Sequence, residues 1–162
     1  MPTEKEYTDF LQGLRPVAIG LVSCEVALDR ASYQRLMKKG GEDRLVRSLR
    51  DSYDVANVKA DYFDVVARLE LEMKDTEQSA AALSIKCEFE AHFHGISDIA
   101  EATARRFAEA ELRVFMWPYF RQFVTDTTAR MSIRPVLIPL ALGPNEGQGS
   151  RNKRPGRSPK SR

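Results

Sequence analysis

Two long runs of alternating apolar and polar residues dominate the middle of the chain. Apolar residues occupy every second position from Phe63 to Met73 and again from Leu83 to Phe93. A period of two over this length predicts two β-strands, each with one buried and one solvent-facing side. The polar linker 75–79 is short, so we predict an antiparallel hairpin.

The first third of the chain predicts a short helix followed by a strand. Thr3 and Glu6 have the spacing of a capping box, and the helix is expected to end before Pro16. Its apolar residues recur at helical spacing: Tyr7, Phe10, Leu11 and Leu14. Residues 19–29 then alternate with a change of phase near Val22, which predicts a strand with a β-bulge.

A crossover and one further strand precede the hairpin. Residues 33–43 carry Tyr33, Leu36 and Met37 among lysines and glycines, and we predict a loop with room for a helical turn. Residues 45–55 alternate in part and predict a strand, with a turn at 57–61.

The final third predicts two helices that meet at a proline. The first would start at a cap on Ser97 or Asp98 and would end or kink at Trp117, because Pro118 cannot donate the helical hydrogen bond. A shorter helix would begin at Pro118. Prolines 135 and 139 then favour an extended exit. The fold class is therefore α+β: one twisted four-stranded antiparallel sheet, followed by a long helix and a shorter second helix packed on one face.

Charge divides the chain into two parts. Six of the 25 Lys and Arg residues lie in 151–162, a segment without any acid, so the remaining 19 stand against 23 acidic residues, a net charge of −4. We expect one folded domain over 1–142 and a disordered basic tail over 143–162. The tail has no aromatic residue for stacking on bases, so nucleic acid is not an expected partner.

The remaining composition favours a cytoplasmic protein. No apolar run approaches the roughly 18 residues of a membrane span, and no segment resembles the core of a signal peptide. Cys24 and Cys87 lack metal-site spacing, so reduced thiols are expected.

No pattern predicts catalysis, a cofactor or a metal. Gly40 and Gly41 are not followed by the Gly-Lys-Ser/Thr of a phosphate-binding loop, which speaks against ATP use. His92 and His94 share one side of their strand with Glu88 and Glu90. Such a pair binds a divalent ion when a neighbouring strand adds a third ligand. The sequence indicates no third ligand, so these residues are expected to form a solvated face of the sheet. Because no catalytic set emerges either, the chain is not expected to be an enzyme.

The C-terminal third resembles the signature of the SecB family of protein-export chaperones. The stretch Trp117-Pro118-Tyr119-Phe120-Arg121-Gln122, with Pro135 and Leu137 after the helix, carries the likeness. It matches at Pro118, Tyr119, Arg121, Pro135 and Leu137, and together with the strand pattern it covers roughly residues 19–140. It departs where Gln122 replaces a Glu, where Lys86 replaces a Leu, and where Ser132 or Ile133 replaces a Gly.

The resemblance implies an ATP-independent holdase that binds unfolded preproteins or other non-native clients in hydrophobic grooves of a homotetramer, a dimer of dimers. It implies client contacts at Tyr33, Leu36, Met37, Trp117, Tyr119 and Phe123, each of which has a core role as its alternative; for Phe123 the core role is favoured. It also implies docking of the translocase motor SecA on Glu25 and Glu88. A charged sheet face that deters edge pairing explains the same acids and is favoured.

Two other functions remain open. SecB-like proteins also serve as chaperones of antitoxins in toxin–antitoxin systems, and the departures from the family pattern leave room for this role. A non-chaperone adaptor that binds one folded partner through its sheet edge or acidic face belongs to a different class. It predicts a single stoichiometric partner and no activity on generic unfolded protein.

Overall fold

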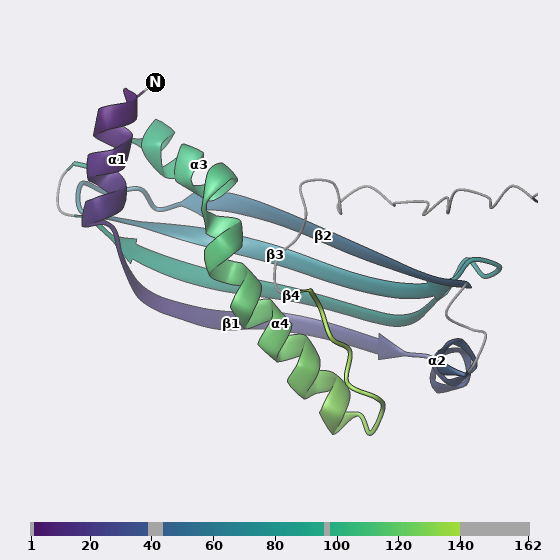
Figure 1. The fold of residues 1–162 in the computed structure, drawn as a ribbon. Coiled ribbons are helices and arrows are strands. Elements are labelled where there is room, and N and C mark those ends of the chain that lie inside the picture. The colour runs from purple at the N-terminus through teal and green to yellow at the C-terminus, as the bar shows by residue number, and fades with distance from the viewer. Residues whose placement is uncertain (1, 39–43, 96–97, 140–162) are drawn as a thin grey trace, which may run out of the picture.

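A computed structural model of the chain describes residues 2–38, 44–95 and 98–139. One long sheet is crossed on a single face by helices, with a further helix at each end (Figure 1). The elements in chain order are α1 (Glu4–Gly13), β1 (Arg15–Leu28), α2 (Arg30–Met37), β2 (Leu45–Ala56), β3 (Tyr62–Asp75), β4 (Ala81–His94), α3 (Glu101–Ala110) and α4 (Leu112–Arg130). The predicted α+β fold with a four-stranded antiparallel sheet is confirmed. The predicted tail 143–162 lies outside the described residues.

The sheet has the strand order β1-β4-β3-β2, and every pair is antiparallel. The predicted hairpin is β3–β4, and the predicted bulge is a register shift between Leu21 and Ser23 in β1. The strands β1 and β2 form opposite edges of the sheet, and α2, which follows β1, lies at one end of the sheet (Figure 1). The alternation seen in the sequence matches the burial: odd-numbered residues of β3 and β4 face the helices, and even-numbered ones face outward.

An aromatic cluster fixes the helices to the sheet. The ring of Phe93 lies 5.3 Å from that of Phe63 and 5.0 Å from that of Phe107, measured between centroids. All three side chains are fully buried. Each such pair contributes roughly 0.5–1.5 kcal/mol beyond the burial of its area. The cluster therefore joins β3, β4 and α3 into one core, and Phe10 of α1 packs beside it.

The predicted helix break at Pro118 is wrong, and so is the predicted order of helix lengths. The shorter helix α3 comes first and ends at Ala110, whereas α4 passes through Pro118 and is 19 residues long. Packing explains the position of the break. Phe107 and Leu112 are both fully buried, but five residues lie about 140° apart on a continuous helix. A break at Glu111 lets both side chains face the sheet.

Three local predictions also need correction or completion. The helix α3 begins at Glu101 with Ala100 at the cap position, so Asp98 is not its cap, and Ser97 lies outside the described residues. The first part of the predicted crossover belongs to an eight-residue helix, α2, which begins before it at Arg30; residues 39–43 lie outside the described residues. Ser132 follows the end of α4 with φ = 55°, the left-handed conformation that favours glycine. Of the two residues named as replacing a Gly of the family pattern, it is therefore Ser132 that has the conformation typical of glycine.

Candidate functional site

The helix α2 starts at a cap formed by Asp29. The Asp29 carboxylate accepts hydrogen bonds from the backbone amides of Ala31 and Ser32 at 3.1 and 3.2 Å, and from the Ser32 hydroxyl at 2.6 Å. These bonds, that of the hydroxyl above all, lower the pKa of Asp29, because they favour its charged form. The cap thereby sets where α2 begins and which residues it turns toward the sheet.

One side of α2 faces the core and the other borders a groove. Leu36 is only 1 % exposed and belongs to the hydrophobic core. Tyr33 is also buried, but its hydroxyl donates to the carbonyl of Arg134 at 3.1 Å. Burial raises the pKa of Tyr33, so the hydroxyl keeps its proton and remains a donor. Tyr33 thus ties α2 to the segment that follows α4.

That segment, residues 134–139, is extended and is here called the exit segment. Its backbone is held by side chains of α4. The indole Nε1 of Trp117 donates to the carbonyl of Pro139 at 2.7 Å, and Arg121 Nε donates to the carbonyl of Ile138 at 3.0 Å. The buried hydroxyl of Thr128 accepts from the amide of Val136 at 3.0 Å. The exit segment is therefore fastened through its main chain.

Between α2, the edge strand β2 and the exit segment lies a groove of about 590 Å³. Its lining is mainly apolar, with two arginines: Tyr33, Met37, Leu45, Arg47, Met73, Arg134, Pro135, Val136 and Leu137. Val136 and Met73 are buried, whereas Leu137 is 67 % exposed. The groove therefore offers apolar surface and positive charge, and among its lining residues there is no carboxylate. It suits an extended apolar segment, with acidic groups favoured beside the arginines.

The structure brings together only some of the predicted client contacts. Tyr33 and Met37 line the groove. Leu36 lies in the core, and Trp117 is buried where it fastens the exit segment. Neither of these two residues lines the groove, so a client contact at Leu36 or Trp117 stays a prediction.

Tyr119 and Phe123, the remaining predicted contacts, lie on α4 outside the groove lining. Tyr119 is exposed, so a contact there stays a prediction. Phe123 is partly buried and meets the ring of Phe89 edge-on, with centroids 6.4 Å apart. Its favoured core role agrees with this packing.

Sequence reasoning missed most of the groove wall. Pro135 and Leu137 were noticed only as part of a signature, Met73 only as part of a buried strand face, and Arg47 and Arg134 were assigned no role. The signal that could have found Leu137 was an apolar residue between two prolines in an extended segment, since extended chains expose alternate side chains. The arginines gave no such signal.

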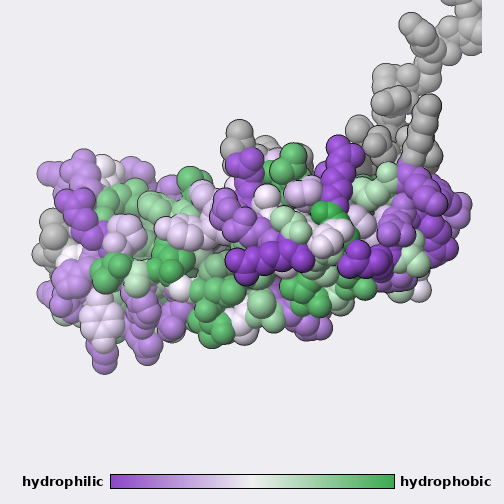
Figure 2. Space-filling model, turned by 90° about the horizontal axis from the view of Figure 1, so that it is seen from below, coloured by the Kyte–Doolittle hydropathy of each residue, from purple (hydrophilic) through white to green (hydrophobic). Residues whose placement is uncertain are grey.

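A second apolar region lies away from the groove. Figure 2 shows apolar surface gathered along the middle of the molecule, seen from below the view of Figure 1, with hydrophilic surface toward either end. The exposed large apolar residues of β1 and α4 are Val17, Leu21, Val22, Val114, Phe115 and Tyr119. A hollow of about 230 Å³ beside Phe115 and Leu14 adds to this region. Exposed apolar surface of this kind marks a place of association.

The outer face of the sheet carries Glu25 and Glu88, the predicted motor-docking residues. A hollow of about 760 Å³ crosses the middle of the sheet here. Glu88 accepts from Arg68 Nε at 2.8 Å, and Glu25 lies opposite Lys86 in the register. Arg68 also pairs with Asp54. The acids of this face are thus interleaved with bases, so the face is not a uniformly acidic surface.

Comparisons with known proteins identify the fold. A SecB-like chaperone of Mycobacterium tuberculosis, Rv1957, in complex with a ChAD peptide from the Rv1956 HigA1 antitoxin, matches with a TM-score of 0.65 at 21 % sequence identity, and the match covers 83 % of this chain and 94 % of that chain. The chain therefore has the SecB-like fold, as the resemblance implied. A crystal structure of a protein of unknown function from Streptococcus agalactiae also matches, with a TM-score of 0.47 at 8 % identity, covering 78 % of this chain and 96 % of that chain.

Comparison by sequence identifies no relative. No protein-family model matches the chain, and neither does any curated protein. Among the described helices, none is long and apolar enough to cross a membrane.

Proposed function

We propose that the protein is an ATP-independent holdase chaperone that binds non-native clients in the groove between α2 and the exit segment. The observation that carries the proposal is the groove itself, an open apolar channel whose wall is an extended segment with Leu137 exposed. A folded client hides its apolar groups. A chaperone with such a groove therefore selects unfolded chains by apolar surface alone, without an energy source.

A chaperone of an antitoxin is the second candidate. The Mycobacterium tuberculosis protein with the same fold is a SecB-like chaperone bound to an antitoxin peptide. One short apolar segment of an antitoxin would occupy the groove of about 590 Å³ as well as a segment of a preprotein would. The two functions would use the same groove. A general holdase would bind many clients there, whereas an antitoxin chaperone would bind one.

We further propose that the protein acts in the cytoplasm as a homotetramer. The edge strand β1 presents Val17, Leu21 and Val22 to solvent, and α4 presents Val114 and Phe115. Covering these side chains with other copies of the chain would remove apolar surface from water. Each copy brings one groove, and weak contacts repeated over several grooves hold a long client tightly through effective concentration.

Docking of SecA stays a weaker proposal, because Glu88 is already paired with Arg68 within the sheet. Substituting Glu25 and Glu88 by Gln together tests it. If the outer face docks a motor, affinity for SecA falls while client binding remains.

The experiment that tests the main proposal is suppression of aggregation. A slow-folding client is diluted from denaturant with increasing amounts of the full chain and no nucleotide, and light scattering follows its aggregation. The size of the chaperone is measured in parallel. We expect suppression at near-stoichiometric amounts of a tetramer. Failure to suppress, together with stoichiometric binding of one antitoxin, would favour the second candidate. Binding of one folded partner only would favour the adaptor.

A further inference from the structure

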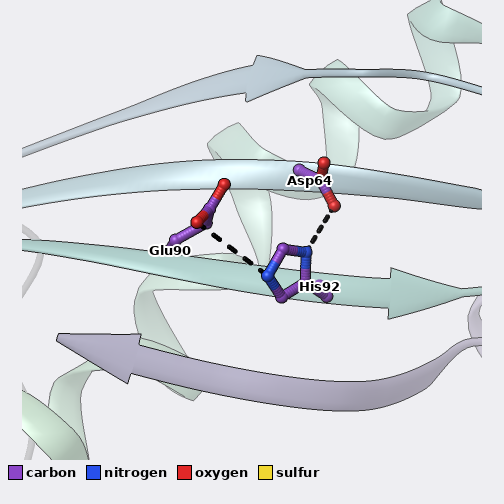
Figure 3. Close-up of side chains that lie close together, drawn as sticks. All are labelled: Asp64, Glu90 and His92. Carbon is purple, nitrogen blue, oxygen red and sulfur yellow. Dashed lines mark hydrogen bonds and ion pairs between the residues drawn. The ribbon is translucent and has the colours of Figure 1, made fainter. Parts of the chain in front are cut away.

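A histidine lies between two carboxylates on the outer face of the sheet. Asp64 of β3 and His92 of β4 are register partners, and Glu90 precedes His92 by two residues on the same face (Figure 3). One candidate ligand atom from each residue lies within 4.8 Å of the others. This is the only such group of three or more His, Cys, Asp or Glu residues in the part of the chain that the structure describes.

Asp64 fixes the imidazole. The residue is 6 % exposed. One carboxylate oxygen lies 2.6 Å from His92 Nδ1, and the other accepts from Asn57 Nδ2 at 2.9 Å. A carboxylate only accepts hydrogen bonds, so Nδ1 of the neutral imidazole carries the proton. The lone pair of the ring then resides on Nε2. This is the arrangement in which a carboxylate orients a metal-binding histidine.

The lone pair of Nε2 is directed toward Glu90. The distance between His92 Nε2 and Glu90 Oε2 is 3.9 Å, too long for a hydrogen bond. Two ligand atoms on a tetrahedral Zn²⁺, each about 2.1 Å from the ion, lie about 3.4 Å apart. A small rotation of the Glu90 side chain would bring its oxygen from 3.9 Å to this distance from His92 Nε2. Both side chains are about two-fifths exposed, so the rotation is unhindered by the core.

The neighbouring strand leaves room for the ion and its water. Gly20 of β1 is the register partner of Glu90, and a Cβ placed on it would meet no atom within 4 Å. Water molecules can therefore complete the coordination on that side. His94 is engaged elsewhere, with its Nε2 3.3 Å from Asp61.

We propose that His92 Nε2 and Glu90 bind one divalent cation of the Zn²⁺ class, with Asp64 as the positioning residue. An imidazole nitrogen with a carboxylate oxygen is a ligand pair that suits Zn²⁺, while Mg²⁺ and Ca²⁺ prefer oxygen ligands alone. The sequence indicated no third residue for this histidine because Asp64 lies on another strand, 28 positions away. The ion would stabilise the folded state by mass action.

Zn²⁺ titration of the chelator-stripped full chain, in competition with a chromogenic chelator, tests the proposal. All variants carry Cys24→Ser, because Cys24 is exposed and thiols bind zinc. We expect one site per chain that is lost in His92→Gln and in Glu90→Gln. In Asp64→Asn the affinity should fall about 10–100-fold. His94→Gln is the matched control and should bind as the parent does.

Two further readouts separate a coordination site from adventitious binding. Co²⁺ in the same site should give the visible absorption of tetrahedral cobalt, and affinity should fall as the imidazole is protonated at acidic pH. In His92→Gln the amide can still donate to Asp64, so the fold should persist, and circular dichroism checks this. The proposal is overturned if the parent binds no Zn²⁺ above the chelator background. It is also overturned if His92→Gln keeps the site, or if His94→Gln weakens it as much as Glu90→Gln does.

Discussion

Leu137 offers the most direct test of the groove. The side chain is 67 % exposed and lines the groove from the exit segment. Burying a whole leucine side chain is worth roughly 1.5–3 kcal/mol, so covering the exposed two-thirds with a client is worth about 1–2 kcal/mol. Because 1.4 kcal/mol corresponds to a factor of ten in affinity, Leu137→Ser should weaken client binding about 5–30-fold.

The measurement is fluorescence anisotropy with a labelled client that is reduced and carboxymethylated, and so cannot fold. The substituted side chain is exposed, so the free energy of unfolding should change by no more than about 0.5 kcal/mol. Denaturation with urea verifies this for each variant. A loss of affinity can then be assigned to the groove rather than to the fold.

Tyr62→Ser is the matched control. Tyr62 is another large, exposed apolar residue, 39 % exposed, but it pairs with His94 at the end of β3 opposite the groove. Its substitution should leave affinity within a factor of two. Equal weakening by both substitutions, or unchanged binding by Leu137→Ser, would show that clients do not use this groove.

Three further predictions concern stability. Thr128→Val removes the buried hydroxyl that accepts from the Val136 amide and donates to the Val124 carbonyl at 2.8 Å. The free energy of unfolding, measured with urea, should fall by about 1–3 kcal/mol. A fall below about 0.5 kcal/mol would contradict the attachment of the exit segment through Thr128. Ser132→Gly should stabilise the chain by about 1 kcal/mol, because glycine adopts φ = 55° without steric strain, whereas Ser132→Ala should not. Burial raises the pKa of Cys87 from its usual 9.0 to about 12. The folded state therefore holds this proton more tightly than the unfolded state does, so its contribution is complete below pH 9 and is lost as the pH rises toward 12. Urea midpoints should accordingly fall above pH 9, and less steeply in Cys87→Ala; identical slopes in the two proteins would refute the assignment.

The sheet could be predicted because its sequence is simple. The odd-numbered residues from Phe63 to Met73 are apolar and face the helices, so period-two patterning alone located β3 and β4. The helices were harder. Pro118 was expected to mark the boundary between two helices, but α4 continues through it. The boundary between α3 and α4 lies at Glu111 instead, because this position allows Phe107 and Leu112 to be buried together. Local propensity does not contain that information.

The site was predictable only in part. Tyr33 and Met37 were found because apolar residues in a polar crossover stand out. Arg47 and Arg134 line the same groove, but nothing in their sequence neighbourhoods indicates that β2 and the exit segment meet. Asp64 and His92 are likewise joined only by strand register. Contacts between distant segments depend on topology, which hydropathy patterns do not specify.

The exit segment is attached to α4 through its main chain, so its position does not depend on the side chains that it presents to the groove. Trp117, Arg121 and Thr128 bind main-chain groups of residues 136–139, and these groups are the same whatever side chains the segment carries. The side chain of Leu137 projects away from that attachment. If the groove binds clients as proposed, substitutions at this position would change which sequences it accepts, while the backbone of the exit segment stays in place.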